Sequence, residues 1–308
     1  MRFYGPYAAD NGACPYLEGR NWAAEYVIAE DDGRPGSPPF PETSGAPSAG
    51  DEASDSASES APHFPLLPWR MQRNSFEEDV PPAAALPVPH PDAPSSTYNE
   101  LLQAGFRRSG RAFYRPHCAD CAECVSLRVD VARFVPGRDM RRALKKNRDV
   151  TVEVVPVDPT RSQEPSPHDE SAFGLYQKFV EVRYPTPTSL PTPMGYQQSF
   201  LVHAGNTWEF RYHVGDRLLG AGFVDLTYEA ASSVYFFFDP EEAWRSLGTY
   251  SVLREIDFCR QTGRPWLYLG FRVAQCRAMA YKARYGPHQL LDPVHGWISA
   301  LPRSDRQI

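Results

Sequence analysis

Long apolar runs are missing from this sequence of 308 residues. No stretch approaches the roughly 18 to 20 apolar residues that a membrane-spanning helix needs, so we expect no membrane partner. Residues 1–6 contain no apolar segment like that of a secretory signal, which favours a cytoplasmic protein. The sequence also lacks a Walker phosphate loop, a zinc-protease helix and a Gly-x-Gly-x-x-Gly motif, so it gives no sign of the functions that these motifs carry.

Cysteine is scarce, with six among the 308 residues, and three of the six fall in one short motif. Cys118, Cys121 and Cys124 form a Cys-x-x-Cys-x-x-Cys pattern, which is more typical of metal ligands in a reducing compartment than of a disulfide scaffold. Cys14 would complete four thiolates around one soft ion. Zinc and an iron–sulfur cluster use the same four sulfurs, so both stay open, as do unligated thiols.

Charge is unevenly distributed along the chain, although the net charge is only −6. Residues 30–100 carry 3 Lys/Arg and 13 Asp/Glu, whereas residues 101–148 carry 12 Lys/Arg and 4 Asp/Glu. Such asymmetry indicates a polyanion-binding surface beside a solvating linker. The alternative is a basic face that only interacts with solvent.

The acidic stretch is also rich in proline. Fourteen prolines lie between residues 30 and 100, and residues 45–61 have almost nothing apolar beyond alanine. Such a segment buries too little surface to offset its ordering entropy, so we expect residues 31–95 to be a disordered insertion.

The stretch of residues 232–285 predicts a βαβ unit. Residues 233–238 are β-branched and aromatic and indicate a buried strand, which Pro240 ends. A turn at residues 247–250 leads into a helix, and residues 266–271 form a second apolar strand. The helix N-terminus would then face the carboxyl end of the first strand, where backbone N–H groups can hold an anion.

The segments before this unit complete an α+β fold. Residues 171–184 predict an amphipathic helix, and residues 208–212 and 218–228 predict strands joined by a turn. Helices, then a β-meander, then a βαβ unit is the element order of the GNAT acyltransferase fold. We therefore expect a GNAT-like domain at residues 149–308, and a smaller cysteine-bearing, basic domain made of residues 1–30 and 96–148.

Several motifs in the same order and spacing resemble the arginyl-/leucyl-tRNA–protein transferases. They lie at residues 14–17, 106–110, 134–147, 233–240, 246–251, 253–256, 268–271 and 279–285. The resemblance implies transfer of an amino acid from aminoacyl-tRNA to a protein N-terminus, which marks the protein for degradation. It covers most of the chain outside the insertion, which the family usually replaces by a shorter link. The chain departs from the family at Arg277 and Ala278, where Pro-Lys is usual.

The resemblance and the chemistry of transfer together suggest roles for individual residues. Asp239 and Tyr281 are the candidates for proton handling, and Lys282 and Arg284 for holding the carboxylate of an acceptor that begins with Asp or Glu. The candidates for contact with the phosphates of tRNA are Arg107, Arg108, Arg142, Lys145 and Lys146. Ser246, Gly248 and Thr249 would line the pocket for the 3′ end of the tRNA. Each of these residues also has an ordinary structural alternative, such as a turn residue or a solvated cation.

The donor amino acid is the least determined feature. The cysteine triplet is a bacterial trait within the family, which favours leucine over arginine.

The transfer itself needs no cofactor, although a structural zinc or iron–sulfur cluster fits the cysteines. The alternatives are an acyl-CoA-dependent acyltransferase of the same fold, disfavoured because residues 245–248 lack a two-glycine pyrophosphate loop, and a non-catalytic tRNA- or degron-binding protein.

Overall fold

The computed structural model describes residues 2–14, 16–17, 20–30, 69–70, 94–158, 165–184, 191–202 and 205–300. The expected insertion at residues 31–95 lies outside the described residues except at 69–70 and 94–95, so its disorder stays a prediction. Among the helices of the described part, none is long and apolar enough to cross a membrane.

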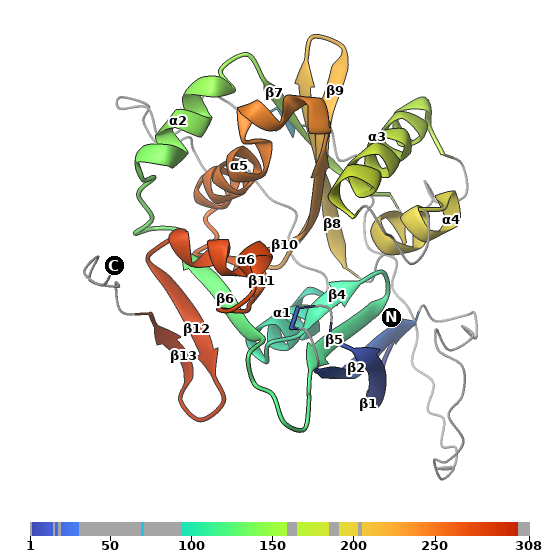
Figure 1. Cartoon of the computed structure of the whole chain (residues 1–308), viewed down its shortest axis with the longest axis vertical. Helices are drawn as coiled ribbons and strands as arrows, with labels where there is room; N and C mark the ends of the chain where they lie inside the picture. The colour runs from blue at the N-terminus through green and yellow to red at the C-terminus, as the bar shows by residue number, and fades with distance from the viewer. Residues whose placement is uncertain are drawn as a thin grey trace, which may run out of the picture.

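Two β-sheets form the framework (Figure 1). The smaller sheet holds, in spatial order, the antiparallel strands β1 (Arg2–Ala13), β2 (Asn21–Glu30), β5 (Ala112–Pro116) and β4 (Arg107–Ser109). The larger sheet holds, in spatial order, β13 (Gly296–Ser299), β12 (His288–Asp292), β6 (Val125–Asp130), β11 (Trp266–Arg272), β10 (Ala230–Phe238), β9 (Arg217–Leu226), β8 (Asn206–Val214), β7 (Thr151–Pro156) and β3 (Trp69–Arg70).

The predicted βαβ unit is confirmed and lies in the middle of the larger sheet. Strands β8, β9 and β10 run antiparallel, and β10 then pairs in parallel with β11 after the chain passes through α5 (Leu247–Gln261). This meander followed by a βαβ crossover confirms the α+β class and the GNAT-like layout. Strands β10 and β11 pair only from Ala230↔Trp266 to Ser232↔Tyr268. Beyond Ser232, β10 continues without β11 as its partner.

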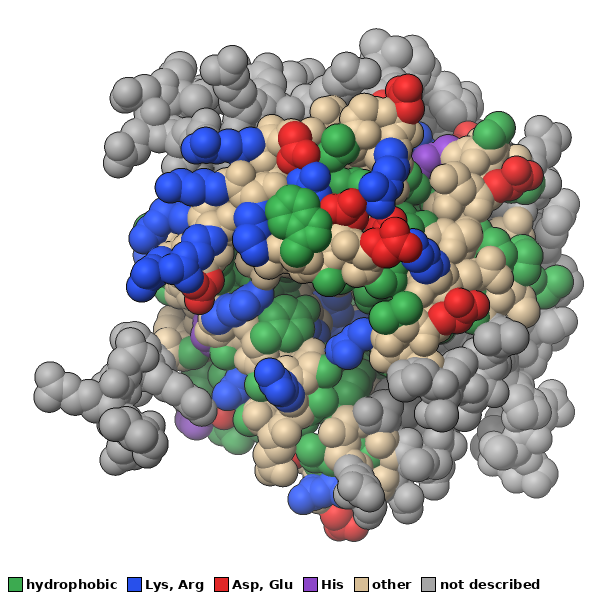
Figure 2. Space-filling model, turned by 45° about the horizontal axis from the view of Figure 1, so that its top comes forward, with side chains coloured by type: hydrophobic (Ala, Val, Ile, Leu, Met, Phe, Trp, Pro, Cys, Tyr) green, Lys and Arg blue, Asp and Glu red, His purple; other side chains and the backbone are tan. Residues whose placement is uncertain are grey.

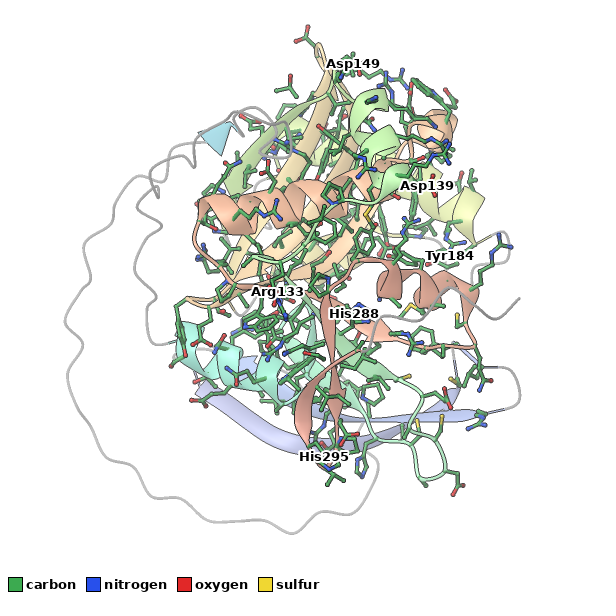
Figure 3. All side chains as sticks on the ribbon, turned by 90° about the vertical axis from the view of Figure 1, so that its left-hand side faces the viewer. Arg133, Asp139, Asp149, Tyr184, His288 and His295 are labelled. Atoms are coloured by element: carbon green, nitrogen blue, oxygen red, sulfur yellow. The ribbon has the colours of Figure 1, made fainter. Side chains whose placement is uncertain are left out.

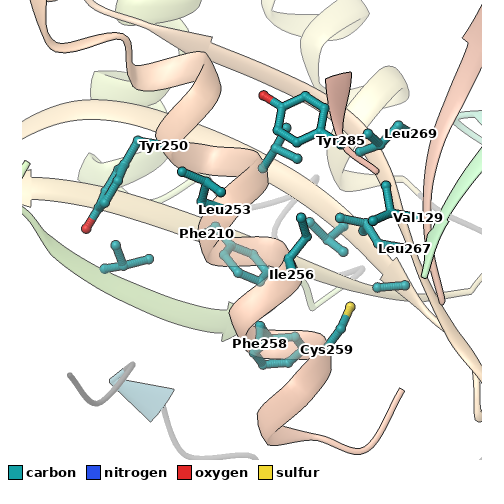
Figure 4. Packing of buried hydrophobic residues seen from close by; sticks show 14 of the residues in the cluster. Val129, Phe210, Tyr250, Leu253, Ile256, Phe258, Cys259, Leu267, Leu269 and Tyr285 are labelled. Carbon is teal, nitrogen blue, oxygen red and sulfur yellow. The ribbon is translucent and has the colours of Figure 1, made fainter. Parts of the chain in front are cut away.

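Other residues cover both faces of β10, which explains why its sequence contains so few polar side chains. On one face, Phe236 packs against Tyr212 in the core beneath α5. On the other, Phe237 packs against Tyr176 of α3 (Pro167–Arg183). Figure 4 shows Leu253, Ile256 and Cys259 of α5 lying over the sheet, and all three are fully buried, as their helical spacing predicts.

The remaining helices are short or lie at the edges of the sheets. The α-helices are α1 (Pro94–Gln103), α2 (Arg138–Lys146), α4 (Pro193–Tyr196) and α6 (Arg277–Ala280). The π-helix is η2 (Gln197–Leu201), and the 3₁₀-helices are η3 (Pro240–Arg245) and η4 (Tyr281–Arg284). Helix α2 packs against α5 on one side of the larger sheet, whereas α3 lies on the other side (Figure 1).

The boundary between the two sheets differs from the expected domain boundary at residue 148. Strand β6 belongs to the larger sheet, where it pairs with β11 and β12. The segment of residues 96–148 therefore supplies β4 and β5 to one sheet and β6 and α2 to the other. Long-range strand pairing, which local sequence patterns do not encode, makes this difference.

Candidate active site

The divergence of β10 and β11 opens a gap in the larger sheet, and Arg107 of β4 fills part of it. Its Nη2 donates a hydrogen bond to the carbonyl oxygen of Ser233, the first residue of β10 beyond the paired segment. A Cβ at Gly270 of β11 would lie 3.3 Å from Nε of Arg107 and 3.5 Å from Nζ of Lys282. Glycine at this position therefore leaves room for two cations, and its φ of +82° also favours glycine.

Lys282 of η4 is half-buried and its amine lies within this gap. Its Nζ donates a hydrogen bond to the carbonyl oxygen of Phe271, at 2.9 Å. Desolvation, followed by the positive charge of Arg107, lowers the pKa of Lys282 to about 7. The neutral amine is therefore well populated near neutral pH, and a neutral amine can accept a proton.

Glu255 brings a carboxyl group to the site from the core side of α5. Its Oε1 accepts a hydrogen bond of 3.0 Å from the hydroxyl of Ser251, which in turn accepts one of 3.2 Å from Tyr212. Burial raises the pKa of Glu255 to about 7, and the hydrogen bond from Ser251, the nearby hydroxyl of Ser233 and the charge of Arg107 limit this rise. The family-like motif at residues 253–256 includes Glu255, but sequence reasoning gave it no role, because it reads as one more residue of a buried helix.

Tyrosines and Arg284 line the side of the site that is open to solvent. Tyr281 is 43% exposed, and desolvation raises its pKa to about 12, so its hydroxyl stays protonated. Arg284 donates hydrogen bonds to the hydroxyl of Thr249, at 2.5 Å, and to that of Tyr285, at 3.3 Å. The end of α3, where Figure 3 labels Tyr184, lies near η4, since the charge of Arg183 offsets a small part of the rise in the pKa of Tyr281.

The start of α5 lies beside Arg284, as its contact with Thr249 shows. A Cβ at Gly248 would meet no heavy atom within 4 Å, so open space adjoins the first turn. Ser246 is exposed and has a left-handed backbone with a φ of 59°, and its carbonyl oxygen accepts from the amides of Thr249 and Tyr250. The structure thus brings Ser246, Gly248 and Thr249 together at one helix end.

Asp239 lies at the carboxyl end of β10, but its negative charge is already balanced by ion pairs. It forms ion pairs with Lys178, at 2.8 Å, and Arg217, at 2.7 Å, and it accepts a hydrogen bond from the amide of Glu241. These partners hold the pKa of Asp239 below its ordinary value despite its burial. A carboxylate held in this way is a poor proton acceptor, so we keep Tyr281 and not Asp239 for proton handling.

Arg108 is also placed differently from its predicted role. Its guanidinium is fully buried and pairs with Asp225 of β9, with Nε 2.6 Å from Oδ2 and Nη2 2.9 Å from Oδ1. Successive side chains of β4 point to opposite faces of the strand, so Arg107 lies in the gap and Arg108 lies in the core. Neither is on the surface, so neither is placed to contact the phosphates of a docked tRNA.

A basic surface lies over α2 instead. Figure 2 shows Lys and Arg side chains gathered on this part of the face, above a hollow. The exposed cations of α2 include Arg141, Arg142, Lys145 and Lys146. Arg142 pairs with Asp139, labelled in Figure 3, whereas Lys146 donates a hydrogen bond of 2.6 Å to the carbonyl oxygen of Trp244.

Trp244 is an exposed aromatic residue beside these cations that sequence reasoning missed. Its side chain is 56% exposed, and the guanidinium of Arg245 lies 4.5 Å from the centre of its ring. Arg245 is fixed in turn by Asp149, at 2.7 Å, so the tryptophan is attached to the end of α2. No periodic pattern marks Trp244, because it belongs to a 3₁₀-helix of six residues.

The four cysteines lie near one another but do not form a ligand set. Nearby thiols Cys14, Cys118 and Cys121 contribute, after desolvation, to raising the pKa of Cys124 to about 12. No group of three or more residues that could hold a metal ion is found in the described part of the chain. Since the thiols lack metal-binding geometry in this structure, a zinc or iron–sulfur site stays a prediction and no step of the chemistry below uses one.

Comparison with known proteins agrees with the sequence motifs. The family described as "Arginine-tRNA-protein transferase, C terminus" matches residues 171–292, and the one described as "Arginine-tRNA-protein transferase, N terminus" matches residues 12–142. The protein named aspartate/glutamate leucyltransferase from Aeromonas hydrophila is 38% identical over 201 residues, which cover 64% of this chain and 79% of that one. Its namesake from Chromohalobacter salexigens is 36% identical over 210 residues, covering 67% of this chain and 80% of the other.

Two solved structures show distant likeness to this chain. L-PGS from Bacillus licheniformis matches with a TM-score of 0.36 and 9% identity, over 57% of this chain and 50% of that one. FemX matches with a TM-score of 0.36 and 9% identity, over 57% of this chain and 60% of that one. A likeness at this level carries no functional argument.

Proposed function

This chain belongs to the arginine-tRNA-protein transferase family, and we propose that it transfers an amino acid from aminoacyl-tRNA to the N-terminal α-amine of proteins that begin with Asp or Glu. Leucine is the proposed donor residue, because the relatives reported above are named leucyltransferases. The proposed product is a protein marked for degradation by its new N-terminal residue, and the proposed location is the cytoplasm. The observation that carries the chemistry is the half-buried, partly desolvated amine of Lys282 in the gap between β10 and β11.

Transfer needs a neutral nucleophile and a place for negative charge. The acceptor α-amine attacks the ester carbonyl carbon, a C–N bond forms, and the C–O bond to the terminal ribose breaks. Lys282, with its pKa lowered to about 7, accepts the proton that the acceptor amine must lose. Tyr281 keeps its proton and can donate a hydrogen bond to the oxyanion of the tetrahedral intermediate. The ribose hydroxyl leaves with a proton, which the protonated Lys282 can return.

Acceptor recognition is proposed for Arg284. Its guanidinium is exposed at the mouth of the site and is oriented by Thr249 and Tyr285. A carboxylate of an N-terminal Asp or Glu fits such a group, because a guanidinium binds a carboxylate through two parallel hydrogen bonds. Lys282, predicted as a second carboxylate ligand, suits proton transfer better since its charge is suppressed.

The donor class is tested by a transfer assay with charged tRNA. Purified protein is incubated with radiolabelled leucyl-tRNA or arginyl-tRNA and peptides that begin with Asp, Glu, Arg or Ala, before and after loading with zinc or with iron and sulfide. We expect label from leucyl-tRNA on the Asp and Glu peptides alone. Label from arginyl-tRNA would retain the reaction and change the donor. A folded protein that transfers neither would contradict the proposal and favour acyl-CoA-dependent transfer or binding alone.

For tRNA binding, we propose the surface formed by α2 and Trp244. Lys145 and Lys146 are exposed cations, and the ring of Trp244 presents a flat apolar face beside them. Cations neutralise phosphates and release counterions, whereas an exposed indole stacks on an unpaired base. The single-stranded end of tRNA offers both phosphates and unpaired bases.

The contributions of charge and of stacking to tRNA binding on this surface should differ in how they depend on salt concentration. In a Lys145→Ala/Lys146→Ala variant, the slope of log Kd against log salt concentration for tRNA binding should fall by roughly 1.5 to 2. In Trp244→Ala, we expect binding to weaken about tenfold with the slope unchanged. Arg133→Ala removes an exposed cation away from α2 and serves as the control. An unchanged slope in the double variant would place the tRNA elsewhere.

A further inference from the structure

Two buried polar atoms of the candidate site have no hydrogen-bond partner. They are Nη1 of Arg107 and Oε2 of Glu255. Arg107 is 7% exposed and Glu255 is 1% exposed, so bulk water does not serve these groups freely. Buried polar atoms are almost always hydrogen-bonded in folded proteins, and leaving one unpaired is costly. Two such atoms on side chains close enough for the charge of Arg107 to act on Glu255 point to a ligand.

Another polar atom of each side chain is already bonded within the protein. Nη2 of Arg107 donates to the carbonyl oxygen of Ser233, and Oε1 of Glu255 accepts from Ser251. Each side chain is therefore fixed by a bond within the protein, while Nη1 and Oε2 are left for another molecule. Both lie close to the proposed chemistry, because the charge of Arg107 acts on Lys282 and the charge of Glu255 acts on Tyr281.

The unused donor and acceptor define what can bind. Nη1 of Arg107 is a cationic donor and requires an acceptor, such as a carbonyl oxygen or an oxyanion. Oε2 of Glu255 requires a donor and favours a cation, because an incoming positive charge stabilises the carboxylate in this buried setting. An α-aminoacyl group carries an ammonium and a carbonyl oxygen on adjacent carbons, so it offers both partners at once.

We propose that Arg107 and Glu255 form a binding site for an α-aminoacyl group, with its ammonium on Oε2 of Glu255 and its carbonyl oxygen on Nη1 of Arg107. This inference deepens the proposed function and rests on it. The same chemistry is present in the aminoacyl ester of the donor tRNA and in the first residue of the acceptor protein. An acyl group without an α-amine, such as a simple acyl-CoA thioester, would leave Glu255 unpaired and is disfavoured by this site.

Isosteric replacement of the ammonium tests the site. Leucyl-tRNA is compared with the 2-hydroxy-4-methylpentanoyl-tRNA of the same tRNA, in which a hydroxyl replaces the α-amine. A peptide beginning with Asp is compared in the same way with its N-terminal hydroxyl analogue. Binding of each probe is measured for the wild-type protein and for Glu255→Gln. Glu209→Gln is the control, since Glu209 is a fully buried carboxylate on β8 that pairs with His168 and Arg211 outside the site.

We expect the wild-type protein to prefer the amine form of one probe by about tenfold, because a charge-assisted hydrogen bond is roughly twice as strong as a neutral one. Glu255→Gln should remove most of this preference and Glu209→Gln should retain it. Loss of the preference between the two tRNAs assigns the site to the donor, and loss between the two peptides assigns it to the acceptor.

Two results would overturn the inference. One is a wild-type protein that does not distinguish the amine from the hydroxyl in either probe, a measurement that does not depend on how a variant folds. The other is a folded Glu255→Gln protein with an undiminished preference. Both are distinct from failure of the proposed function, which is read from transfer of leucine or arginine by the wild-type protein in the same preparation.

Discussion

Replacement of Lys282 by methionine should lower kcat/KM for transfer by about two to four orders of magnitude, the usual contribution of a positioned general base. Methionine keeps the length and apolar character of the side chain while removing the group that accepts the proton. Lys178→Met is the matched control, because Lys178 is a surface lysine on α3 that pairs with Asp239 and Glu241. Initial rates with leucyl-tRNA and a peptide beginning with Asp provide the measurement.

A second replacement separates proton transfer from simple electrostatics. Since the pKa of Lys282 is lowered to about 7, its amine is protonated below that pH and neutral above it, so kcat/KM should rise with pH through about 7. Lys282→Arg keeps a positive charge that does not titrate, and its rising limb should shift towards about 8, the ordinary pKa of the acceptor α-amine. An arginine variant with wild-type rates and an unmoved profile would exclude Lys282 as the base. Thermal unfolding of each variant shows whether the loss of the bond to Phe271 has disturbed folding.

Among the variants considered, loss of the ion pair between Arg108 and Asp225 should lower the free energy of unfolding the most. Both side chains have no solvent exposure, and Asp225 also accepts hydrogen bonds from Thr207, at 2.6 Å, and Tyr98, at 2.7 Å. Arg108→Met leaves a buried carboxylate without its counter-charge, which should lower the free energy of unfolding by about 3 to 5 kcal/mol. Denaturant unfolding followed by tryptophan fluorescence measures this loss.

The double variant Arg108→Met/Asp225→Asn distinguishes a buried unpaired charge from lost packing. If the cost of Arg108→Met comes from the stranded carboxylate, neutralising Asp225 should recover part of it. Arg142→Met removes an exposed pair with Asp139 and should leave the unfolding midpoint nearly unchanged. A loss in Arg108→Met no larger than in Arg142→Met would show that the buried pair does not stabilise the fold.

The parts of the fold that the sequence predicted are those with strong local patterns. Residues 233–238 are apolar on both faces and became β10, and the spacing of Leu253, Ile256 and Cys259 placed them on the buried face of α5. The hairpin of β12 and β13 escaped prediction, because its residues are only partly buried and show no clear alternation. Its place in the sheet depends on pairing with β6, more than a hundred residues earlier.

The candidate site was predicted in part, for a related physical reason. Sequence motifs identified Tyr281, Lys282 and Arg284 as neighbours along the chain, and the structure brings them to one side of the gap. The role of Arg108 could not be foreseen, because its partner Asp225 lies 117 residues away. Glu255 lies in the family-like motif at residues 253–256, which gave it no individual role, and Trp244 lies in none of the motifs. Burial sets the first apart and exposure the second.

The divergence of β10 from β11 has a consequence for how this protein can be divided. The gap holds an arginine from β4 of the smaller sheet, and the far side of β11 is bordered by β6, which also precedes residue 148. No contiguous piece of the chain therefore contains the larger sheet without also containing β4 and β5 of the smaller sheet. A C-terminal fragment beginning at residue 149 would lose Arg107 and turn β11 into an unprotected edge strand. Moving this chemistry to another protein would therefore require β4 and β6 together with the part of the chain that follows residue 148.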